Sequence, residues 1–235
     1  MRRDALGLLA LGALLLGACG SGAEAGEPDR GPAPSTVALT GLAALEPVAT
    51  PAPSTTVPRP EPLDVVVVGD SLALSAREEI SELLAVADVD LLAFDAVEGR
   101  RTADGVHNKP SGKTAVAELA ARHDPDVWVI ALGTNDVGGQ ARPDEFRADV
   151  LALLDELPPT ARIVWLDTWI KSRIDGCREL NAVLREVAAE RGAMTVVDWF
   201  QFGDDPGLIV SDGVHLTDQG QLRFAEQIVA ALRAA

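Results

Sequence analysis

A serine, a histidine and an aspartate in this sequence have the types and the local settings that nucleophilic catalysis needs. Ser71 lies in the segment Gly69-Asp70-Ser71-Leu72, and His215 follows Asp212 by three residues in Asp212-Gly213-Val214-His215. A serine hydroxyl is a poor nucleophile until an imidazole accepts its proton, and that imidazole needs a group that fixes its tautomer. Ser71, His215 and Asp212 can therefore act as nucleophile, general base and orienting carboxylate.

Two further segments hold hydrogen-bond donors that can stabilise a developing negative charge. Asn135, in Gly133-Thr134-Asn135-Asp136, carries an amide that can donate to an oxyanion, and Gly99 can bring its backbone N–H close to a substrate. Each residue also has a structural interpretation: Ser71 or His215 as a helix cap, Asn135 as a turn former, Gly99 as a loop glycine with positive φ. Taken one at a time, the segments leave both interpretations open.

The four segments follow apolar runs that alternate with longer stretches of helical periodicity. The apolar runs predict strands at residues 65–68, 89–94, 127–132, 163–166 and 194–197. The periodic stretches predict helices at residues 72–86, 112–122, 143–157, 176–191 and 217–232. Alternation of this kind predicts an α/β fold of three layers, with helices on both faces of a five-stranded parallel sheet. Ligands of such sheets bind beyond the carboxyl ends of the strands, where the four segments begin.

The four segments, in this order, resemble the four sequence blocks of the SGNH hydrolases, also called the GDSL family. The resemblance covers residues 64–235. It implies a sheet of flavodoxin-like order, no cofactor, and an ester hydrolase that works through an acyl-enzyme. It also implies that Ser71 is the nucleophile, His215 the base and Asp212 its orienter. The oxyanion hole that it implies consists of the Ser71 N–H, the Gly99 N–H and the Asn135 amide.

Three other features each have two interpretations. Arg100 can contact an anionic or carbohydrate substrate, or it can pair with the surplus carboxylates. Trp169 can line an acyl or sugar site, or it can pack in the core. Asp70 and Asp136 can join Asp212 and His215 in a metal cluster of the phosphatase type. The serine between them and the lack of further nearby histidines favour the interpretation without a metal.

The first 63 residues are predicted to direct and tether the domain. Residues 1–19 resemble a lipoprotein signal sequence, because Arg2 and Arg3 precede an apolar run that ends at Leu16-Gly17-Ala18-Cys19. Cys19 is then the lipidated residue, and an ordinary secretory signal is the alternative. Residues 20–63 contain nine of the 15 prolines, which predicts an extended, disordered linker. We therefore expect an extracytoplasmic domain anchored to the membrane through a lipid, or else a secreted one.

Composition narrows the remaining function classes. The chain has 20 Lys and Arg against 36 Asp and Glu, a net charge of −16, so phosphate backbones would repel it and we expect no nucleic-acid partner. Its two cysteines cannot form a disulfide-rich scaffold. The favoured function is hydrolysis of small acyl esters or of O-acetyl groups on glycans. An O-acyltransferase acting on an envelope polysaccharide and a non-catalytic binding module are the alternatives, and the oligomeric state stays open.

Overall fold

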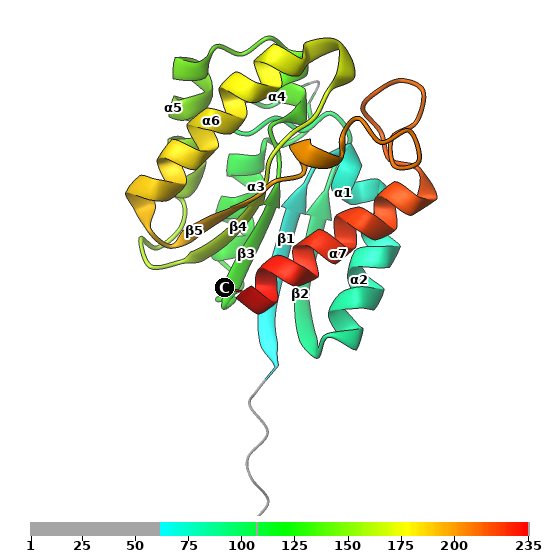
Figure 1. The fold of residues 1–235 in the computed structure, drawn as a ribbon. Coiled ribbons are helices and arrows are strands. Elements are labelled where there is room, and N and C mark those ends of the chain that lie inside the picture. The colour runs from blue at the N-terminus through cyan, green and yellow to red at the C-terminus, as the bar shows by residue number, and fades with distance from the viewer. Residues whose placement is uncertain (1–61, 107, 235) are drawn as a thin grey trace, which may run out of the picture. The chain divides into compact units, whose positions relative to one another are not determined.

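A five-stranded parallel sheet forms the centre of the computed structural model, which describes residues 62–106 and 108–234 (Figure 1). The strands lie in the order β2-β1-β3-β4-β5. Their bounds are β1 Leu63–Gly69, β2 Val89–Ala96, β3 Val127–Ala131, β4 Arg162–Leu166 and β5 Met194–Val197. This is the flavodoxin-like order. The predicted fold class is therefore confirmed.

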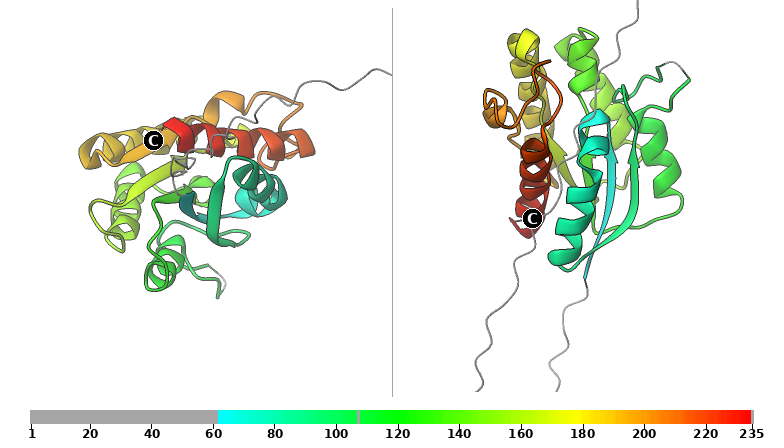
Figure 2. Two further views of the ribbon diagram at one scale, coloured as in Figure 1. Left: turned by 90° about the horizontal axis from the view of Figure 1, so that it is seen from below. Right: turned by 90° about the vertical axis from the view of Figure 1, so that its right-hand side faces the viewer.

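Seven α-helices and two short 3-10 helices lie between and after these strands within the described part of the chain. Their bounds are α1 Ser71–Ser75, α2 Arg77–Val86, α3 Gly112–Ala120, α4 Thr134–Gly138, α5 Pro143–Leu154, η1 Lys171–Arg173, α6 Ile174–Arg191, η2 Phe200–Phe202 and α7 Asp218–Ala234. Helices α1, α2 and α7 pack on one face of the sheet, and α3, α5 and α6 pack on the other. In the right-hand view of Figure 2, α7 and α3 lie on opposite sides of the sheet.

Side-chain alternation along the strands builds a core on each face of the sheet. In β1, Val65 and Val67 belong to the core beneath α2 and α7, whereas Val66 and Val68 belong to the core beneath α3 and α5. All four are fully buried, as expected for a strand with helices on both sides. β2 differs because it is an edge strand: it pairs with β1 alone, and its side chains are partly buried or exposed.

The helices depart from their predicted bounds at two places that matter for the site. The predicted helix at residues 72–86 is divided into α1 and α2, because Ala76 leaves the helical conformation with ψ at 13°. Alanine is the strongest helix former, so the residue type does not account for this break. Ala76 is fully buried. No local pattern indicates α4, a five-residue helix that carries Asn135. Both short helices lie directly after strands, where the chain turns away from the sheet.

The predicted signal sequence at residues 1–19, with Cys19, lies outside the described residues, as does nearly all of the predicted linker at 20–63. Among the helices that the structure describes, none is both long enough and apolar enough to cross a bilayer.

Candidate active site

Helix α1 follows β1 at the upper edge of the sheet in Figure 1, where the strand arrowheads point, and Ser71 lies at its start. Asp70 accepts a hydrogen bond from the Leu72 N–H (2.9 Å) and so caps α1, which makes Ser71 the first residue of that helix. Ser71 is therefore not the cap. A Cβ on Gly69 would lie 2.3 Å from the Cβ of Ala73, so the glycine allows α1 to fold tightly over the strand end. This turn exposes the Ser71 hydroxyl beyond the sheet.

The loop before α7 carries the histidine and the aspartate. One carboxylate oxygen of Asp212 accepts the backbone N–H groups of Val214 (2.8 Å) and His215 (3.0 Å), which folds the segment into a tight turn. Gly213 has a φ of +73°, and a Cβ there would lie 2.5 Å from the Cβ of Lys171. Its carbonyl accepts the N–H of Lys171 (2.8 Å), and this hydrogen bond joins the turn to the start of η1. Only glycine fits this position without strain.

The structure brings Ser71, His215 and Asp212 into one hydrogen-bonded chain. The Ser71 Oγ lies 3.2 Å from His215 Nε2, although the two residues are 144 positions apart in the sequence. His215 Nδ1 lies 2.8 Å from the second carboxylate oxygen of Asp212. Because an ionised carboxylate can only accept, Nδ1 carries the proton of the neutral ring and Nε2 is free to accept from the serine hydroxyl. This is the tautomer that a general base requires.

The environment of Asp212 keeps its carboxyl group ionised. Desolvation raises the pKa of this group, but the hydrogen bonds from the His215 ring, from the His215 N–H and from the Val214 N–H outweigh it, so the pKa lies below its ordinary value. The Asp212 and His215 side chains are about half exposed, at 48% and 49%. Solvent can therefore reach the imidazole directly.

An open cleft of about 510 Å³ surrounds the serine hydroxyl. It is lined by Ser71, Leu74, Ser75, Glu98, Gly99, Asn135 and His215. Within the described residues, the backbone N–H groups of Ser71 and Gly99 donate to no protein acceptor. Gly99 has a φ of +74° in the turn that Arg100 closes by donating to the Val97 carbonyl (3.2 Å). Two backbone donors are thus available in the same cleft as the nucleophile.

The Asn135 amide reaches the cleft from α4 but is also held from behind. Its Nδ2 donates to the Arg100 carbonyl (3.1 Å) and, over a longer distance, to the Asp70 carboxylate (3.3 Å). Asp70 is only 1% exposed, and burial raises its pKa to about 7. A carboxyl group that titrates near neutrality therefore lies directly behind the amide.

The substrate-contact interpretations of Arg100 and Trp169 were wrong, because both side chains are buried. The Arg100 side chain is fully buried, pairs with the Asp95 carboxylate (2.8 Å), and donates to the Asp95 and Gly69 carbonyls. Trp169 is 2% exposed and packs edge to face on Phe200, with ring centroids 5.1 Å apart. Arg100 therefore belongs to the framework of the loop that carries Gly99, and Trp169 belongs to the core on the face covered by α1, α2 and α7.

Several residues that line or support the cleft were not found by sequence reasoning. Leu74 and Ser75 lie one helical turn after Ser71, so the helical spacing could have identified them. Glu98 directly precedes Gly99, so its position next to a predicted site residue could have identified it. The hydrogen bonds between Asp136 and Thr102, two of which measure 3.0 and 3.2 Å, join segments that no local pattern relates. Among the residues that the structure describes, no three His, Cys, Asp or Glu side chains are arranged to hold a metal ion.

Comparisons with known proteins agree with this geometry. A family model described as GDSL-like lipase/acylhydrolase matches residues 67–223. The fold is similar to that of TesA, with a TM-score of 0.61, 21% identity, and coverage of 73% of this chain and 98% of that one. It is also similar to the catalytic domain of the peptidoglycan O-acetyltransferase OatA from Streptococcus pneumoniae, with a TM-score of 0.56, 21% identity, and coverage of 74% and 94%.

A third similar structure is the esterase EstA from Pseudoalteromonas, with a TM-score of 0.59, 13% identity, and coverage of 73% of this chain and 97% of that one. At these identities the solved structures establish the shared fold. A search of curated proteins finds no match.

Proposed function

This chain belongs to the GDSL-like lipase/acylhydrolase family, and on that premise we propose that it is a serine esterase that cleaves small acyl or O-acetyl esters. The observation that carries the proposal is the chain of contacts from the Ser71 hydroxyl through His215 to Asp212, at 3.2 and 2.8 Å. Serine, histidine and aspartate joined in this way form the arrangement that activates a hydroxyl for attack on a carbonyl.

The reaction proceeds in two halves. In the first, Ser71 Oγ attacks the ester carbonyl carbon while His215 Nε2 accepts the hydroxyl proton, and the carbonyl oxygen becomes an oxyanion. When the carbonyl re-forms, the bond to the alcohol oxygen breaks, His215 returns the proton to that oxygen, and an acyl-enzyme remains. In the second half, water attacks the acyl carbon with His215 accepting its proton. The acid is then released and the Ser71 hydroxyl is restored.

The oxyanion is stabilised by the N–H groups of Ser71 and Gly99 and by the Asn135 amide. The two backbone groups have no competing acceptor in the described chain. Asn135 has to exchange one of its present contacts for the oxyanion, and the longer one, to Asp70, is the weaker. Such donors act where charge develops, so they stabilise the transition state more than the bound substrate.

The shape of the cleft favours a small acyl group. Leu74 is the one large apolar side chain among the residues that line it, and the cleft is open to solvent. A long acyl chain would find little apolar surface to cover it there. We therefore favour acetyl and similarly short esters, including acetylated glycans.

O-acyl transfer is the second candidate, because a similar structure is the catalytic domain of a peptidoglycan O-acetyltransferase. In that reaction a glycan hydroxyl replaces water in the second half. The predicted lipid anchor at Cys19 and the linker that follows would place either activity outside the cytoplasm, close to the envelope.

An ester panel tests the proposal. The wild-type protein should hydrolyse p-nitrophenyl acetate faster than the butyrate and octanoate esters, and Ser71→Ala should abolish this activity. Adding a chito-oligosaccharide acceptor and analysing the products separates the two candidates, since acetate indicates hydrolysis and O-acetylated glycan indicates transfer. Activity that survives in Ser71→Ala would contradict the assignment of the nucleophile.

A further inference from the structure

We propose that Asp136 is a positioning residue, which holds the loop of Gly99 against α4 so that the backbone and side-chain donors of the oxyanion hole keep a fixed separation. This inference rests on the proposed esterase function. It concerns a residue that neither touches the substrate nor belongs to the proton path, and whose effect passes through Thr102.

The two donors come from separate parts of the chain. Gly99 lies in the loop after β2, and Asn135 lies on α4 after β3. These strands are not neighbours, because β1 lies between them. Sheet hydrogen bonds therefore do not fix the distance between the donors directly. Contacts between the loop and α4 have to do so.

Asp136 supplies most of those contacts. Its carboxylate accepts the Thr102 N–H (3.2 Å) and the Thr102 hydroxyl (3.0 Å), and it is 3% exposed. The other hydrogen bond between the loop and α4 in the described chain runs from the Asn135 amide to the Arg100 carbonyl, at 3.1 Å, and the Arg101 side chain packs against Gly139 at the end of α4. That bond comes from the same amide that has to reorient when it exchanges Asp70 for the oxyanion. Asp136 is thus the partner whose hydrogen bonds to the loop do not change when Asn135 engages the substrate.

The other side of the loop is fixed by Arg100. Its buried guanidinium donates to the Asp95 carbonyl (2.7 Å) and to the Gly69 carbonyl (3.4 Å), which ties the loop to the ends of β2 and β1. Within the described chain, the guanidinium of Arg100 makes no hydrogen bond to α4. Removing Asp136 should therefore leave the loop attached to the sheet, and to α3 through the Gly112 and Lys113 N–H groups, but less firmly held against α4.

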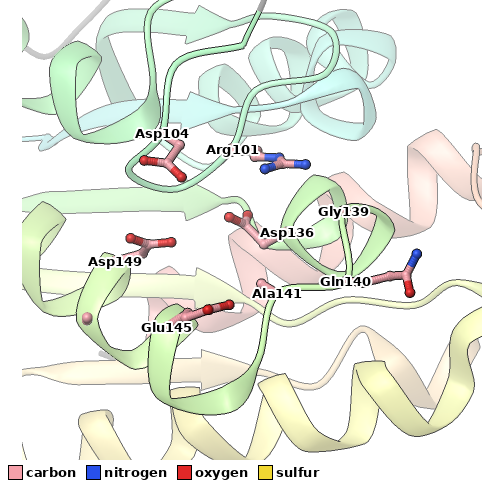
Figure 3. Close-up of a pocket in the computed structure, with 9 residues that line it drawn as sticks. Arg101, Asp104, Asp136, Gly139, Gln140, Ala141, Glu145 and Asp149 are labelled. Atoms are coloured by element: carbon pink, nitrogen blue, oxygen red, sulfur yellow. The ribbon is translucent and has the colours of Figure 1, made fainter.

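Asp136 also faces a cavity of about 470 Å³ behind the oxyanion loops. Figure 3 shows Asp136 pointing toward the loop that carries Arg101 and Asp104, with Asp149 and Glu145 on α5 across the cavity. Asp149 lines the same cavity but has no hydrogen bond to the loop in the described chain. It provides a matched control, since its replacement removes a carboxylate from the cavity and leaves the contact with Thr102 intact.

The positioning role of Asp136 predicts which kinetic constant changes when the residue is replaced. Misplaced donors weaken the binding of the transition state and leave ground-state binding almost unchanged, so kcat should fall while KM stays nearly constant. A displacement of about 1 Å can cost roughly a hundredfold in rate. For Asp136→Ala we expect kcat per active site, counted by titration of the serine, to fall about 10- to 100-fold.

Thr102→Val should give a smaller loss, because it removes the hydroxyl and leaves the N–H, whereas Thr102→Ser should keep the wild-type rate. The double variant Asp136→Ala/Thr102→Val should be no slower than Asp136→Ala, because both changes remove the same contact, the hydrogen bond between the Asp136 carboxylate and the Thr102 hydroxyl. Asp149→Ala should retain the wild-type kcat. The Ki of a boronic acid, which forms a tetrahedral adduct with the serine, should rise in parallel with the loss of kcat.

The outcomes separate the two proposals. A wild-type protein with no esterase activity would overturn the proposed function and this inference together. An active wild type with an unchanged kcat per site in Asp136→Ala would overturn the inference alone. So would an equal loss in Asp149→Ala, or a loss of kcat with an unchanged Ki for the boronic acid.

Discussion

Some residues of the cleft transfer a proton, and others stabilise the negative charge of the oxyanion. His215 Nδ1 contacts one oxygen of Asp212, and the other oxygen of Asp212 closes the backbone turn that carries the imidazole. One carboxylate therefore fixes both the tautomer and the position of the ring. The oxyanion donors have no part in proton transfer, so replacing one should change the rate without changing which group is the base.

Replacing Asp212 tests the tautomer argument. In Asp212→Asn the side chain still accepts the backbone N–H groups through its oxygen, but its amide now donates toward His215 Nδ1. The ring then carries its proton on Nε2 and cannot accept from Ser71, so kcat should fall by about 10²- to 10⁴-fold. Steady-state kinetics on p-nitrophenyl acetate, with circular dichroism to verify the fold, measures this. A loss of less than tenfold would contradict the assigned role.

Replacing Asn135 tests the charge argument. Loss of one oxyanion donor typically lowers kcat by about 10²- to 10³-fold, and we expect that loss for Asn135→Ala with KM changed little. Ser75→Ala is a suitable control, because Ser75 lines the same cleft and its hydroxyl donates to the Leu72 carbonyl (2.9 Å). It should keep nearly the full rate. Equal losses in the two variants would indicate a general disturbance of the cleft.

At the scale of elements, the site is built from the chain that follows β1, β2 and β3 and from the loop before α7. The loop before α7 is held by an antiparallel bridge between Ile209 and Leu216 and by the contact of Gly213 with Lys171. The position of His215 therefore depends on backbone geometry several residues away from the imidazole.

Two glycines with similar backbone conformations make this dependence measurable. Gly213 and Gly192 have φ values of +73° and +75°, but a Cβ would meet Lys171 at the first position and nothing within 4 Å at the second. Gly213→Ala and Gly192→Ala should each lose about 1 to 3 kcal/mol of stability through backbone strain. Only Gly213→Ala should also lose kcat, about tenfold or more. Chemical denaturation and kinetics on both variants measure these effects, and equal kcat values would refute the coupling.

At the scale of the whole molecule, buried carboxyl groups lie within a strongly acidic chain. Burial raises the pKa of Asp70 to about 7 and the pKa values of Asp136 and Asp167 to about 6. In the unfolded chain these groups titrate near 3.8. At pH values between the unfolded and the folded pKa of these groups, the folded state binds more protons than the unfolded state. The free energy of unfolding therefore decreases as pH rises through this range.

The pH dependence of stability should show this decrease between about pH 4 and pH 7. Asp70→Asn keeps the cap of α1, because asparagine caps as well as aspartate does. It should reduce the slope by an amount on the order of 1 kcal/mol per pH unit. Asp124→Asn, at an exposed carboxylate, removes the same charge and should leave the slope unchanged. Urea denaturation at several pH values tests the pair, and a stability that rises with pH in the wild type would contradict the burial argument.

Local patterns were sufficient to predict the sheet and the identity of the residues that meet in the cleft. Strands buried on both faces produce continuous apolar runs, such as the four valines of β1, and parallel strands collect the segments that follow them at one edge. For that reason Ser71, Gly99, Asn135 and His215 could be predicted to lie together from their order alone. The resemblance to the SGNH hydrolases supplied the roles.

Tertiary packing decided what no local pattern records. Local sequence does not distinguish a buried arginine from an exposed one. Arg100 could therefore be assigned to the framework only from the structure, in which its guanidinium donates to the carbonyls of Gly69 and Asp95. The contact of Asp136 with Thr102 joins residues 34 positions apart and depends on how α4 sits against the loop. The sequence by itself determined which groups can react. The packing of segments distant in sequence determined which of them face the substrate and which hold the others in place, because hydrogen bonds and burial depend on distance in space.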